Sequence, residues 1–284
     1  MEYINLYNGV KMPMMSFGVF LFPEEICEQC VLDALDIGYR AFDTAQAYNN
    51  EHLLGNALQR AGIPREELFI TTKVRPQNYA DKTRQTVLES MEKLKTDYLD
   101  LVLLHQPFGD VYAAWRDLEG LYEEGKIRAI GVSNFYADRL VDIAYLAKIR
   151  PMVDQVEFHP LHQRADILEW GKKLDIAIEA WSPFGRGRGG LLDDPQLIRI
   201  GEKYGKTPAQ VILRWDLQKG VPTIARSSNK ERSRQNYDIF DFVLSDEDMA
   251  AIAAMETGVS VFYSHEDPVT VENYAKGILK SREK

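Results

Sequence analysis

Four residues of this sequence carry side chains that could together transfer a proton: Asp43, Tyr48, Lys73 and His105. A tyrosine hydroxyl has a pKa of about 10, so alone it donates efficiently only to a strong base. A neighbouring lysine ammonium favours the phenolate and lowers that pKa, and an aspartate would keep the lysine charged and in place. The set predicts a general acid in which Tyr48 donates the proton and His105 orients a carbonyl, so that an alkoxide is protonated as hydride arrives.

Each of these residues also has a structural interpretation. Asp43 could cap a turn, Tyr48 could be a half-buried loop aromatic, and Lys73 could be a solvated strand end. A lone histidine such as His105 is more often structural than catalytic. The catalytic interpretation therefore depends on whether the fold brings all four together.

The elements that must position them alternate along the chain. Short apolar segments are typical of strands, and the strands are predicted near Ser16–Val19, Arg40–Asp43, Leu68–Lys73, Tyr98–Leu104, Ile127–Val132, Met152–Glu157, Ile176–Trp181 and Val221–Ala225. Apolar stripes at helical spacing predict helices over Glu24–Ile37, Asn50–Ala61, Lys82–Leu94, Val111–Glu124, Ala137–Ala147, Ala165–Lys173 and Thr207–Gln218. A short helix is expected after Arg232, and another over Asp246–Met255 with Ser245 as its N-cap.

This alternation predicts a parallel sheet whose strands are buried on both faces. A closed (β/α)8 TIM barrel of the α/β class fits best, as a single domain over residues 1–284. At the N-terminus, Tyr3–Leu6 and Val10–Met12 flank Asn8-Gly9, which predicts a β-hairpin with a two-residue turn. In such a barrel the carboxyl ends of the strands converge on one rim, so polar residues far apart in the sequence would face one pocket.

Composition excludes several classes of partner. A net charge of −9 argues against nucleic acid and anionic membranes, which need a basic surface. No secretory signal and no run of about 20 apolar residues is visible, so we expect a cytoplasmic protein. Cys27 and Cys30 fit an apolar helix face better than a metal or redox site. His159 and His162 lack helical metal-ligand spacing, so we expect no metal.

Six longer segments are recognisable as family motifs. They are GYRAFDTAQAYNNE (38–51), LFITTKV (68–74), DYLDLVLLHQP (97–107), EEGKIRAIGVSNF (123–135), VDQVEFHP (153–160) and IARSSNKERSRQN (224–236). With them the chain resembles the aldo-keto reductases along nearly its whole length, in particular the prokaryotic members that reduce glyoxal or 2,5-diketogluconate.

The resemblance implies NADPH as the cofactor and assigns roles to many residues. Asp43, Tyr48, Lys73 and His105 would form the catalytic tetrad. The nicotinamide carboxamide would bind Ser133, Asn134 and Gln155, and its ring would stack on Trp181. The loop with Ser182, Phe184 and Gly185 would run along the pyrophosphate. The 2′-phosphate would meet Arg226, Ser227, Ser228 and Arg232, and the adenine would meet Gln235 and Asn236.

The chain departs from the family pattern at several positions. Ala225 and Arg226 stand where proline and lysine are usual, so the positive charge is kept but the geometry changes. Gln106 and Phe20 replace frequent tryptophans, and Asp154 replaces a frequent asparagine. The substrate pocket is expected to contain Phe20, Tyr48, Gln106, Phe108 and a C-terminal loop with Phe262, Tyr263 and His265. Such a mixed lining favours small or oxygenated aldehydes and ketones, such as dicarbonyls or sugar-derived carbonyls, over steroids.

Other interpretations remain open at this stage. Gly185, Gly187 and Gly190 form a G-x-G-x-x-G, which raises a Rossmann fold as an alternative. The motif lies late in the chain, Pro183 interrupts the strand exit, and no second strand ending in an acidic residue follows about twenty residues on. Lys73 could instead be a Schiff-base nucleophile of a lyase. A third alternative is a non-catalytic subunit that senses NADPH. Family members are often monomers, so the resemblance implies a monomer, with a dimer as the alternative.

Overall fold

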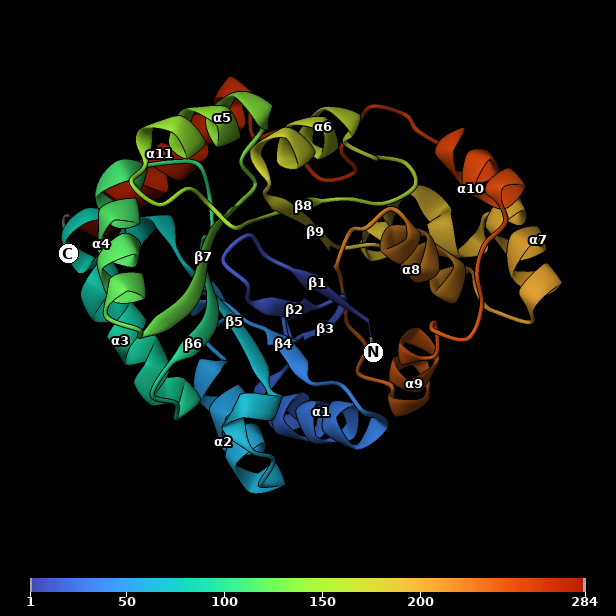
Figure 1. Cartoon of the computed structure of the whole chain (residues 1–284), viewed down its shortest axis with the longest axis horizontal. Helices are drawn as coiled ribbons and strands as arrows, with labels where there is room; N and C mark the ends of the chain where they lie inside the picture. Colours follow the sequence, from blue (N-terminus) through green and yellow to red (C-terminus); the bar gives the residue numbers. More distant parts are fainter. Residues whose placement is uncertain (1, 283–284) are drawn as a thin grey trace.

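A computed structural model describes residues 2–282, and its centre is a closed barrel of parallel strands (Figure 1). Around the barrel the order is β3 to β10, and β10 pairs with β3 to close it. The strands are β3 (Met15–Gly18), β4 (Ala41–Asp43), β5 (Phe69–Val74), β6 (Leu99–Leu104), β7 (Ile127–Ser133), β8 (Val153–Glu157), β9 (Ala177–Trp181) and β10 (Thr223–Ala225). The predicted barrel fold is confirmed, which excludes the Rossmann alternative.

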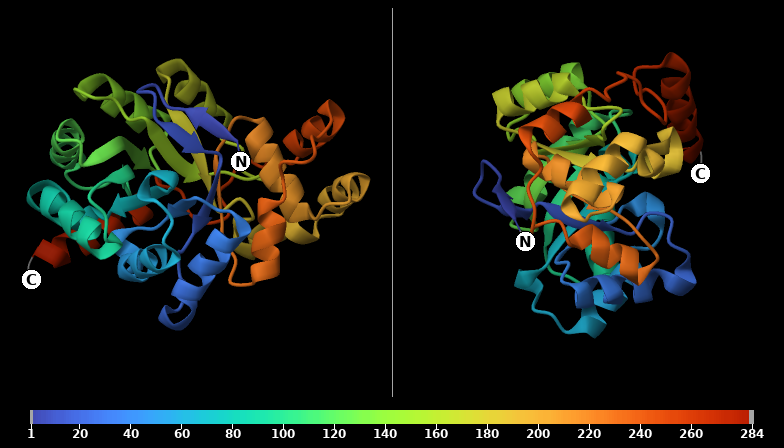
Figure 2. Two further views of the ribbon diagram at one scale, coloured as in Figure 1. Left: turned by 60° about the horizontal axis from the view of Figure 1, so that its bottom comes forward. Right: turned by 90° about the vertical axis from the view of Figure 1, so that its right-hand side faces the viewer.

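Helices surround the barrel and cover the outer face of the strands (Figures 1 and 2). They are α1 (Glu24–Ile37), α2 (Glu51–Ala61), α3 (Thr83–Leu94), α4 (Val111–Glu123), α5 (Ala137–Leu146), α6 (Ala165–Leu174), α7 (Pro195–Tyr204), α8 (Pro208–Gln218), α9 (Lys230–Tyr237), α10 (Asp246–Ala253) and α11 (Pro268–Arg282). Short 3₁₀ helices cover Gln46–Tyr48, Arg65–Glu67, Pro76–Asn78, Ala80–Lys82 and Gly185–Asp193.

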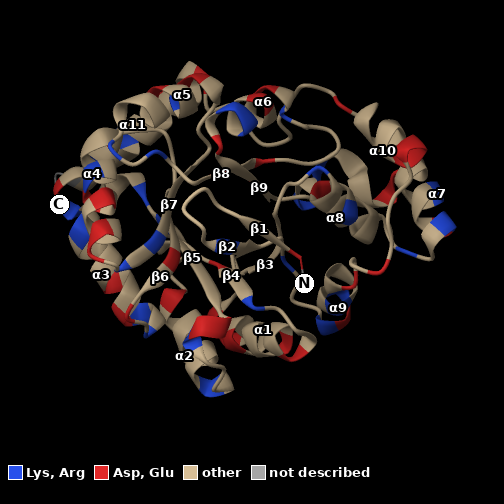
Figure 3. Cartoon of the chain, in the orientation of Figure 1, with Lys and Arg blue, Asp and Glu red and all other residues tan. Residues whose placement is uncertain are grey.

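Strand burial explains why the barrel strands are so apolar. All residues of β5 and β6 are buried, because side chains of a closed barrel face either the interior or the surrounding helices. The charged residues lie mainly on the outer helices (Figure 3). Among the described residues, every helix is too short or too polar to span a lipid bilayer.

The N-terminal hairpin is confirmed, but its two-residue turn was predicted wrongly. Strands β1 (Tyr3–Asn5) and β2 (Lys11–Pro13) are joined by five residues, with Gly9 at φ 87°. The tight turn is shifted by one residue, because Gly9 N donates to Leu6 O at 2.8 Å and leaves Tyr7 and Asn8 as its central residues. The Asn8 side chain donates to Arg128 O at 2.9 Å and accepts from Val10 N at 3.2 Å, so the longer turn ties the hairpin to the start of β7. The hairpin therefore lies at the end of the barrel opposite the carboxyl rim.

Three helices differ from the predictions. Helix α9 starts at Lys230, before Arg232, because the Asn229 side chain accepts from Arg232 N and caps it. Helix α7 was missed, although Asp194 caps it and Pro195 occupies its first position, a recognisable start signal. Helix α11 was missed because its apolar stripe is weak. It contacts the 3₁₀ helix Pro76–Asn78 after β5, at the edge of the barrel's carboxyl end and on the side away from the hairpin (Figure 2).

Candidate active site

Lys73 is the centre of the polar group at the carboxyl rim. It lies near the end of β5, and its side chain is almost fully buried, at 1% exposure. The ammonium donates to Asp43 Oδ1 at 2.5 Å and to Thr44 O at 3.0 Å, and it lies 3.4 Å from the hydroxyl of Tyr48. Strands β4 and β5 are neighbours, so parallel pairing brings the end of one beside the end of the other. Asp43, Lys73 and Tyr48 are thus in direct contact.

The electrostatics of this group differ in one respect from the expectation. Burial raises the pKa of Tyr48 above its ordinary value, and the Lys73 cation offsets that effect only in part. The expected net lowering of the Tyr48 pKa was therefore wrong, although the contribution of Lys73 has the expected sign. Burial disfavours the Lys73 ammonium, but Asp43 and Tyr48 outweigh it and raise the pKa of Lys73. Tyr48 thus retains its proton beside a charged lysine.

His105 follows β6, and its ring contacts that of Tyr48 edge-on, with ring centres 5.7 Å apart. Burial, followed by repulsion from Lys73, lowers the pKa of His105 to about 3. At neutral pH the ring is therefore uncharged. A neutral imidazole next to Tyr48 can orient a carbonyl oxygen by a hydrogen bond but is a poor proton donor.

The loop that carries Tyr48 is fixed by residues that sequence reasoning missed. The Gln46 side chain donates to Thr86 O and Ser90 Oγ, and its oxygen accepts from Asn78 Nδ2 at 2.8 Å. Asn50 donates to Val19 O at 2.8 Å. These bonds tie the loop on either side of Tyr48 to α3, to the 3₁₀ helix Pro76–Asn78 and to the segment after β3. Both residues lie inside the motif 38–51, but nothing in their types indicates the distant partners.

A second buried carboxyl group lies below the tetrad. Gln155 and Glu179 are opposite each other in the register of β8 and β9. Gln155 Nε2 donates to Asp43 Oδ2 at 3.0 Å and to Glu179 Oε2 at 2.8 Å. Burial, with repulsion from Asp43, raises the pKa of Glu179 to about 8. Sequence analysis missed Glu179, although an acidic residue within the apolar strand Ala177–Trp181 was a usable signal.

Ser133, Asn134 and Trp181 form one wall beside this group. Ser133 Oγ donates to Gln155 O at 2.8 Å. Asn134 has φ 64°, and its side chain donates to His105 O at 3.0 Å and accepts from Trp181 Nε1 at 2.9 Å. These bonds fix the plane of the Trp181 indole at the edge of the site.

A cavity of about 620 Å³ opens above the polar group. Its lining brings together most of the predicted site residues, namely Phe20, Asp43, Tyr48, His105, Gln106, Ser133, Asn134, Gln155, Trp181, Ser182, Phe184, Arg226 and Phe262, together with Tyr263. Lining residues that were not predicted are Gly18, Ala47, Ile224 and Tyr274. Pro183 and Arg186, from the loop expected along the pyrophosphate, also line the cavity. Phe108 and His265 were expected in the lining but lie behind the wall, where Phe108 stacks on His265 and contacts Tyr274.

The C-terminal loop reaches the cavity through a carboxylate at the end of β8. Glu157 accepts from Ser260 Oγ at 2.5 Å and from Val261 N at 3.0 Å. Burial works against the charge of Glu157, but bonds from His159, Ser260 and Val261 lower its pKa overall. The fixed loop places Phe262 beside Trp181, with ring centres 5.1 Å apart.

The cavity fits a dinucleotide such as NADP(H). The flat face of Trp181 suits a nicotinamide ring. Gln155 uses both of its N–H groups on Asp43 and Glu179, so only its amide oxygen can bond to a cofactor, as an acceptor. Arg186 and Arg226 supply two cations at the mouth. Arg186 lies over Phe20 at 4.8 Å, and Arg226 lies over Phe22 at 4.5 Å. Gly185 has φ 58°, a conformation that suits close passage of a loop along a phosphate chain.

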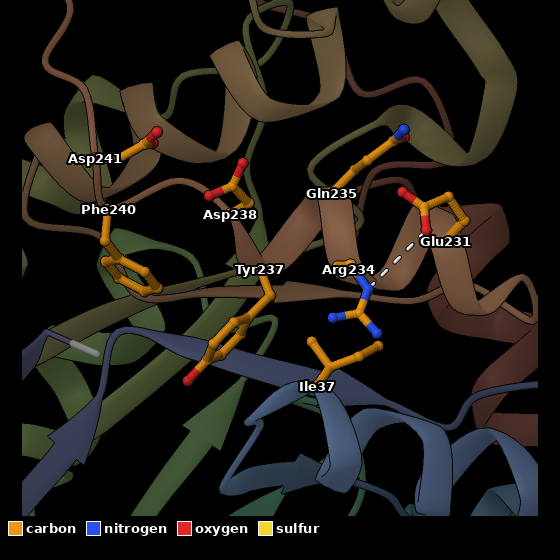
Figure 4. A pocket seen from close by; sticks show the side chains of 8 residues that line it. All are labelled: Ile37, Glu231, Arg234, Gln235, Tyr237, Asp238, Phe240 and Asp241. Atoms are coloured by element: carbon orange, nitrogen blue, oxygen red, sulfur yellow. Dashed lines mark ion pairs between the residues drawn. The ribbon is translucent and has the colours of Figure 1, made fainter.

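Most of the residues predicted around the adenosine and its phosphate lie outside this cavity. Ser227 Oγ accepts from Asn229 N, Ser228 and Arg232 are exposed, and Asn236 is buried. Gln235 lines a separate hollow on the outside of α9 together with Ile37, Arg234 and Tyr237 (Figure 4). Only Arg226 of the predicted phosphate-binding set therefore reaches the cavity lining.

Cys27 and Cys30 are free thiols buried on the inner face of α1. Among residues 2–282, no three or more His, Cys, Asp or Glu side chains are grouped so as to hold a metal ion.

An eight-stranded barrel with Tyr, Lys, Asp and His gathered at its carboxyl rim defines a class of nicotinamide-dependent oxidoreductases. Residues 20–257 match the family model described as the aldo/keto reductase family. The chain belongs to this family, and it is an NADP-dependent oxidoreductase that acts on carbonyl compounds.

Individual relatives agree with this assignment. The chain is 47% identical over 255 residues to a glyoxal reductase of Bacillus subtilis, covering 89% of this chain and 92% of that protein. It is 38% identical to methylglyoxal reductase DkgA of Escherichia coli K12, covering 90% and 94%. An aldo-keto reductase of Bombyx mori, solved in complex with NADP, superposes with a TM-score of 0.89 at 32% identity, covering 96% of this chain and 97% of that one.

Proposed function

We propose that this chain reduces small aldehydes and ketones to alcohols with NADPH, and that Tyr48 is the general acid. Dicarbonyl compounds are the proposed substrates, with sugar-derived carbonyls as the second class. The contact of the half-buried Tyr48 hydroxyl, which lines the cavity, with the buried Lys73 ammonium supports the proposal most directly. The names of the glyoxal and methylglyoxal reductases point to the same substrate class.

When bound, NADPH would be the source of the hydride for the carbonyl carbon. The Tyr48 hydroxyl then gives its proton to the carbonyl oxygen as negative charge develops there. Lys73 stabilises the tyrosinate that remains, and Asp43 holds Lys73 in its charged form. The neutral His105 ring donates a hydrogen bond that orients the carbonyl oxygen. Tyr48 is regenerated when it takes a proton from solvent.

The remaining chain residues in this proposal bind and orient the cofactor. The amide oxygen of Gln155 would accept from the carboxamide, with Ser133 and Asn134 beside it, and Trp181 would stack on the nicotinamide. Ser182, Phe184 and Gly185 follow the pyrophosphate. Arg226, Ser227, Ser228 and Arg232 surround the 2′-phosphate, and Gln235 and Asn236 bind the adenine. Because one chain supplies all of these residues, we propose that the monomer is sufficient for activity.

Neither alternative interpretation of the site has comparable support. A Schiff-base lysine must lose its proton to react, whereas the Asp43 carboxylate raises the pKa of Lys73. A subunit that only senses NADPH would not need a proton donor such as Tyr48 in the cavity lining. Turnover of any carbonyl would exclude it.

The decisive experiment replaces Tyr48 by phenylalanine. We expect Tyr48→Phe to lower kcat for methylglyoxal reduction by about 100-fold or more, because the proton donor is lost. NADPH should still quench the fluorescence of Trp181, because its binding surface is intact. The control is Tyr145→Phe, the same change at an exposed position of α5. Near-normal turnover by Tyr48→Phe would remove Tyr48 from the proposed role.

A further inference from the structure

Gln106 occupies a position in the cavity wall directly after His105. Its main chain is fixed by one tyrosine. The Tyr79 hydroxyl donates to Gln106 O at 2.8 Å and accepts from Gln106 N at 3.1 Å. Tyr79 itself is buried. The backbone of Gln106 therefore has little freedom, and any variation in its polar contacts has to come from the side chain.

The side chain of Gln106 is held by His265, which lies 159 residues further along the chain. His265 Nε2 and Gln106 Oε1 are 2.8 Å apart and buried. The His265 ring stacks on Phe108 at 5.9 Å and contacts Tyr136 and Tyr263 at 5.8 and 5.0 Å. Aromatic packing on several sides fixes the imidazole, so it acts as a rigid partner for the amide.

The chemistry of the pair decides which way the amide points. Burial, with repulsion from Arg164, lowers the pKa of His265 to about 4, so the ring is neutral at pH 7. An amide oxygen only accepts hydrogen bonds, so Nε2 carries the hydrogen. The Gln106 NH₂ group then points away from His265. Among the residues that the structure describes, it has no hydrogen-bond partner, and it is not one of the buried unpaired atoms.

We propose that the Gln106 amide, oriented by His265, is a specificity-determining group that donates a hydrogen bond to a second oxygen of the substrate. This inference rests on the proposed function, in which Tyr48 and His105 hold the reacting carbonyl oxygen. Gln106 directly follows His105, which orients the carbonyl oxygen. The Gln106 NH₂ group therefore suits a second substrate oxygen, carried by the carbon atom that is bonded to the carbonyl carbon. The preferred substrates are therefore α-dicarbonyl and α-hydroxycarbonyl compounds, and simple aldehydes of the same size bind without this bond.

The test compares two aldehydes of nearly the same shape, methylglyoxal and propanal, of which only the first has the second oxygen. A single hydrogen bond is worth about 1 kcal/mol, or roughly five- to tenfold in kcat/KM. We expect Gln106→Leu to lower the ratio of kcat/KM for methylglyoxal to that for propanal by about tenfold. Gln106→Glu, which keeps the size but presents only acceptors, should show the same selective loss.

The orientation by His265 is tested separately. His265→Phe keeps an aromatic ring in the same packing but removes the donor, so it should lower the methylglyoxal-to-propanal ratio while NADPH quenching of Trp181 stays normal. Thermal unfolding of each variant shows whether it is folded. Because two variants are made at Gln106, the test still works if one of them misfolds.

The inference and the proposed function fail in different ways. An unchanged ratio in the folded Gln106 variants, or an equal loss for both aldehydes, overturns the inference alone. A wild-type enzyme that reduces neither aldehyde with NADPH removes the proposed function itself.

Discussion

At the residue scale, the hydrogen-bonded series Lys73, Asp43, Gln155 and Glu179 sets the charge of the site. Gln155 gives both of its N–H groups to the two carboxyl groups. Burial and Asp43 keep Glu179 protonated near neutral pH, because its pKa is raised to about 8. The buried charges close to Tyr48 are then one ammonium and one carboxylate. Ionisation of Glu179 would add a second carboxylate and weaken the positive environment that stabilises the tyrosinate.

Glu179→Gln tests this state of ionisation. An unfolded glutamate has a pKa of about 4.3, so between there and about 8 the folded chain binds more protons than the unfolded chain. The contribution of Glu179 to stability therefore falls as the pH rises through this window. We expect Glu179→Gln to gain free energy of unfolding relative to wild type between pH 5 and pH 8, by roughly 2 kcal/mol or more.

Urea unfolding at several pH values measures this difference. Asp154 and Asp216 are also buried with raised pKa values, so only the difference between variant and wild type isolates Glu179. The exposed Glu66→Gln is the matched control and should show no such trend. A pH-independent difference for Glu179→Gln would mean that Glu179 is ionised in the folded protein.

At the element scale, helix spacing depends on glycines that face a neighbouring backbone. A Cβ on Gly55 of α2 would lie 2.3 Å from Lys93 O and 2.8 Å from Leu94 Cα, both on α3. Backbone atoms cannot move aside as a flexible side chain can, so the close contact of α2 and α3 requires glycine here. Gly120 of α4 is different, because the nearest atom to its Cβ would be Arg84 Nη1 at 4.0 Å.

The two glycines therefore predict opposite effects of the same substitution. Gly55→Ala should lower the free energy of unfolding by about 1–3 kcal/mol, because the helices must separate. Gly120→Ala should raise it by roughly 0.5–1 kcal/mol, because alanine loses less backbone entropy in a helix and has room. Urea titration of both variants checks the prediction, and a stabilised Gly55→Ala would show that α2 shifts freely on α3.

At the scale of the whole molecule, a chain with a net charge of −9 places cations at the cavity mouth. Arg186 and Arg226 both line the cavity, and each lies over an aromatic ring. An acidic protein repels the phosphates of a dinucleotide at long range, so local cations have to supply the attraction. Arg226 is the one member of the predicted 2′-phosphate set that lines the cavity.

Arg226→Ala tests the preference for NADPH over NADH. Because charged hydrogen bonds are worth about 1.5–3 kcal/mol, we expect the Kd for NADPH to rise by about tenfold or more and that for NADH by less than about twofold. Added salt should weaken the binding of NADPH more in the wild type than in the Arg226→Ala variant. The exposed Arg199→Ala on α7 is the control. Equal losses for both cofactors would contradict the 2′-phosphate assignment.

The sequence by itself determined the barrel and the rim on which the site lies. Apolar strands alternating with amphipathic helices are a local pattern, and it predicted all eight barrel strands. The positions of Asp43, Lys73 and His105 at or just after strand ends followed from the same pattern, because parallel strands place their carboxyl ends together. The family motifs added the assignment of roles but did not change the geometry.

Only the tertiary structure decided how these residues affect one another. The net rise of the Tyr48 pKa comes from burial by the surrounding loops, which no local pattern shows. The contacts of Gln155 with Asp43 and of His265 with Gln106 join residues 112 and 159 positions apart. The wider hairpin turn at Asn8 likewise depends on a distant partner, Arg128 O. Periodicity is fixed by neighbours in the chain, whereas desolvation and pairing depend on distances that exist only after the barrel has closed.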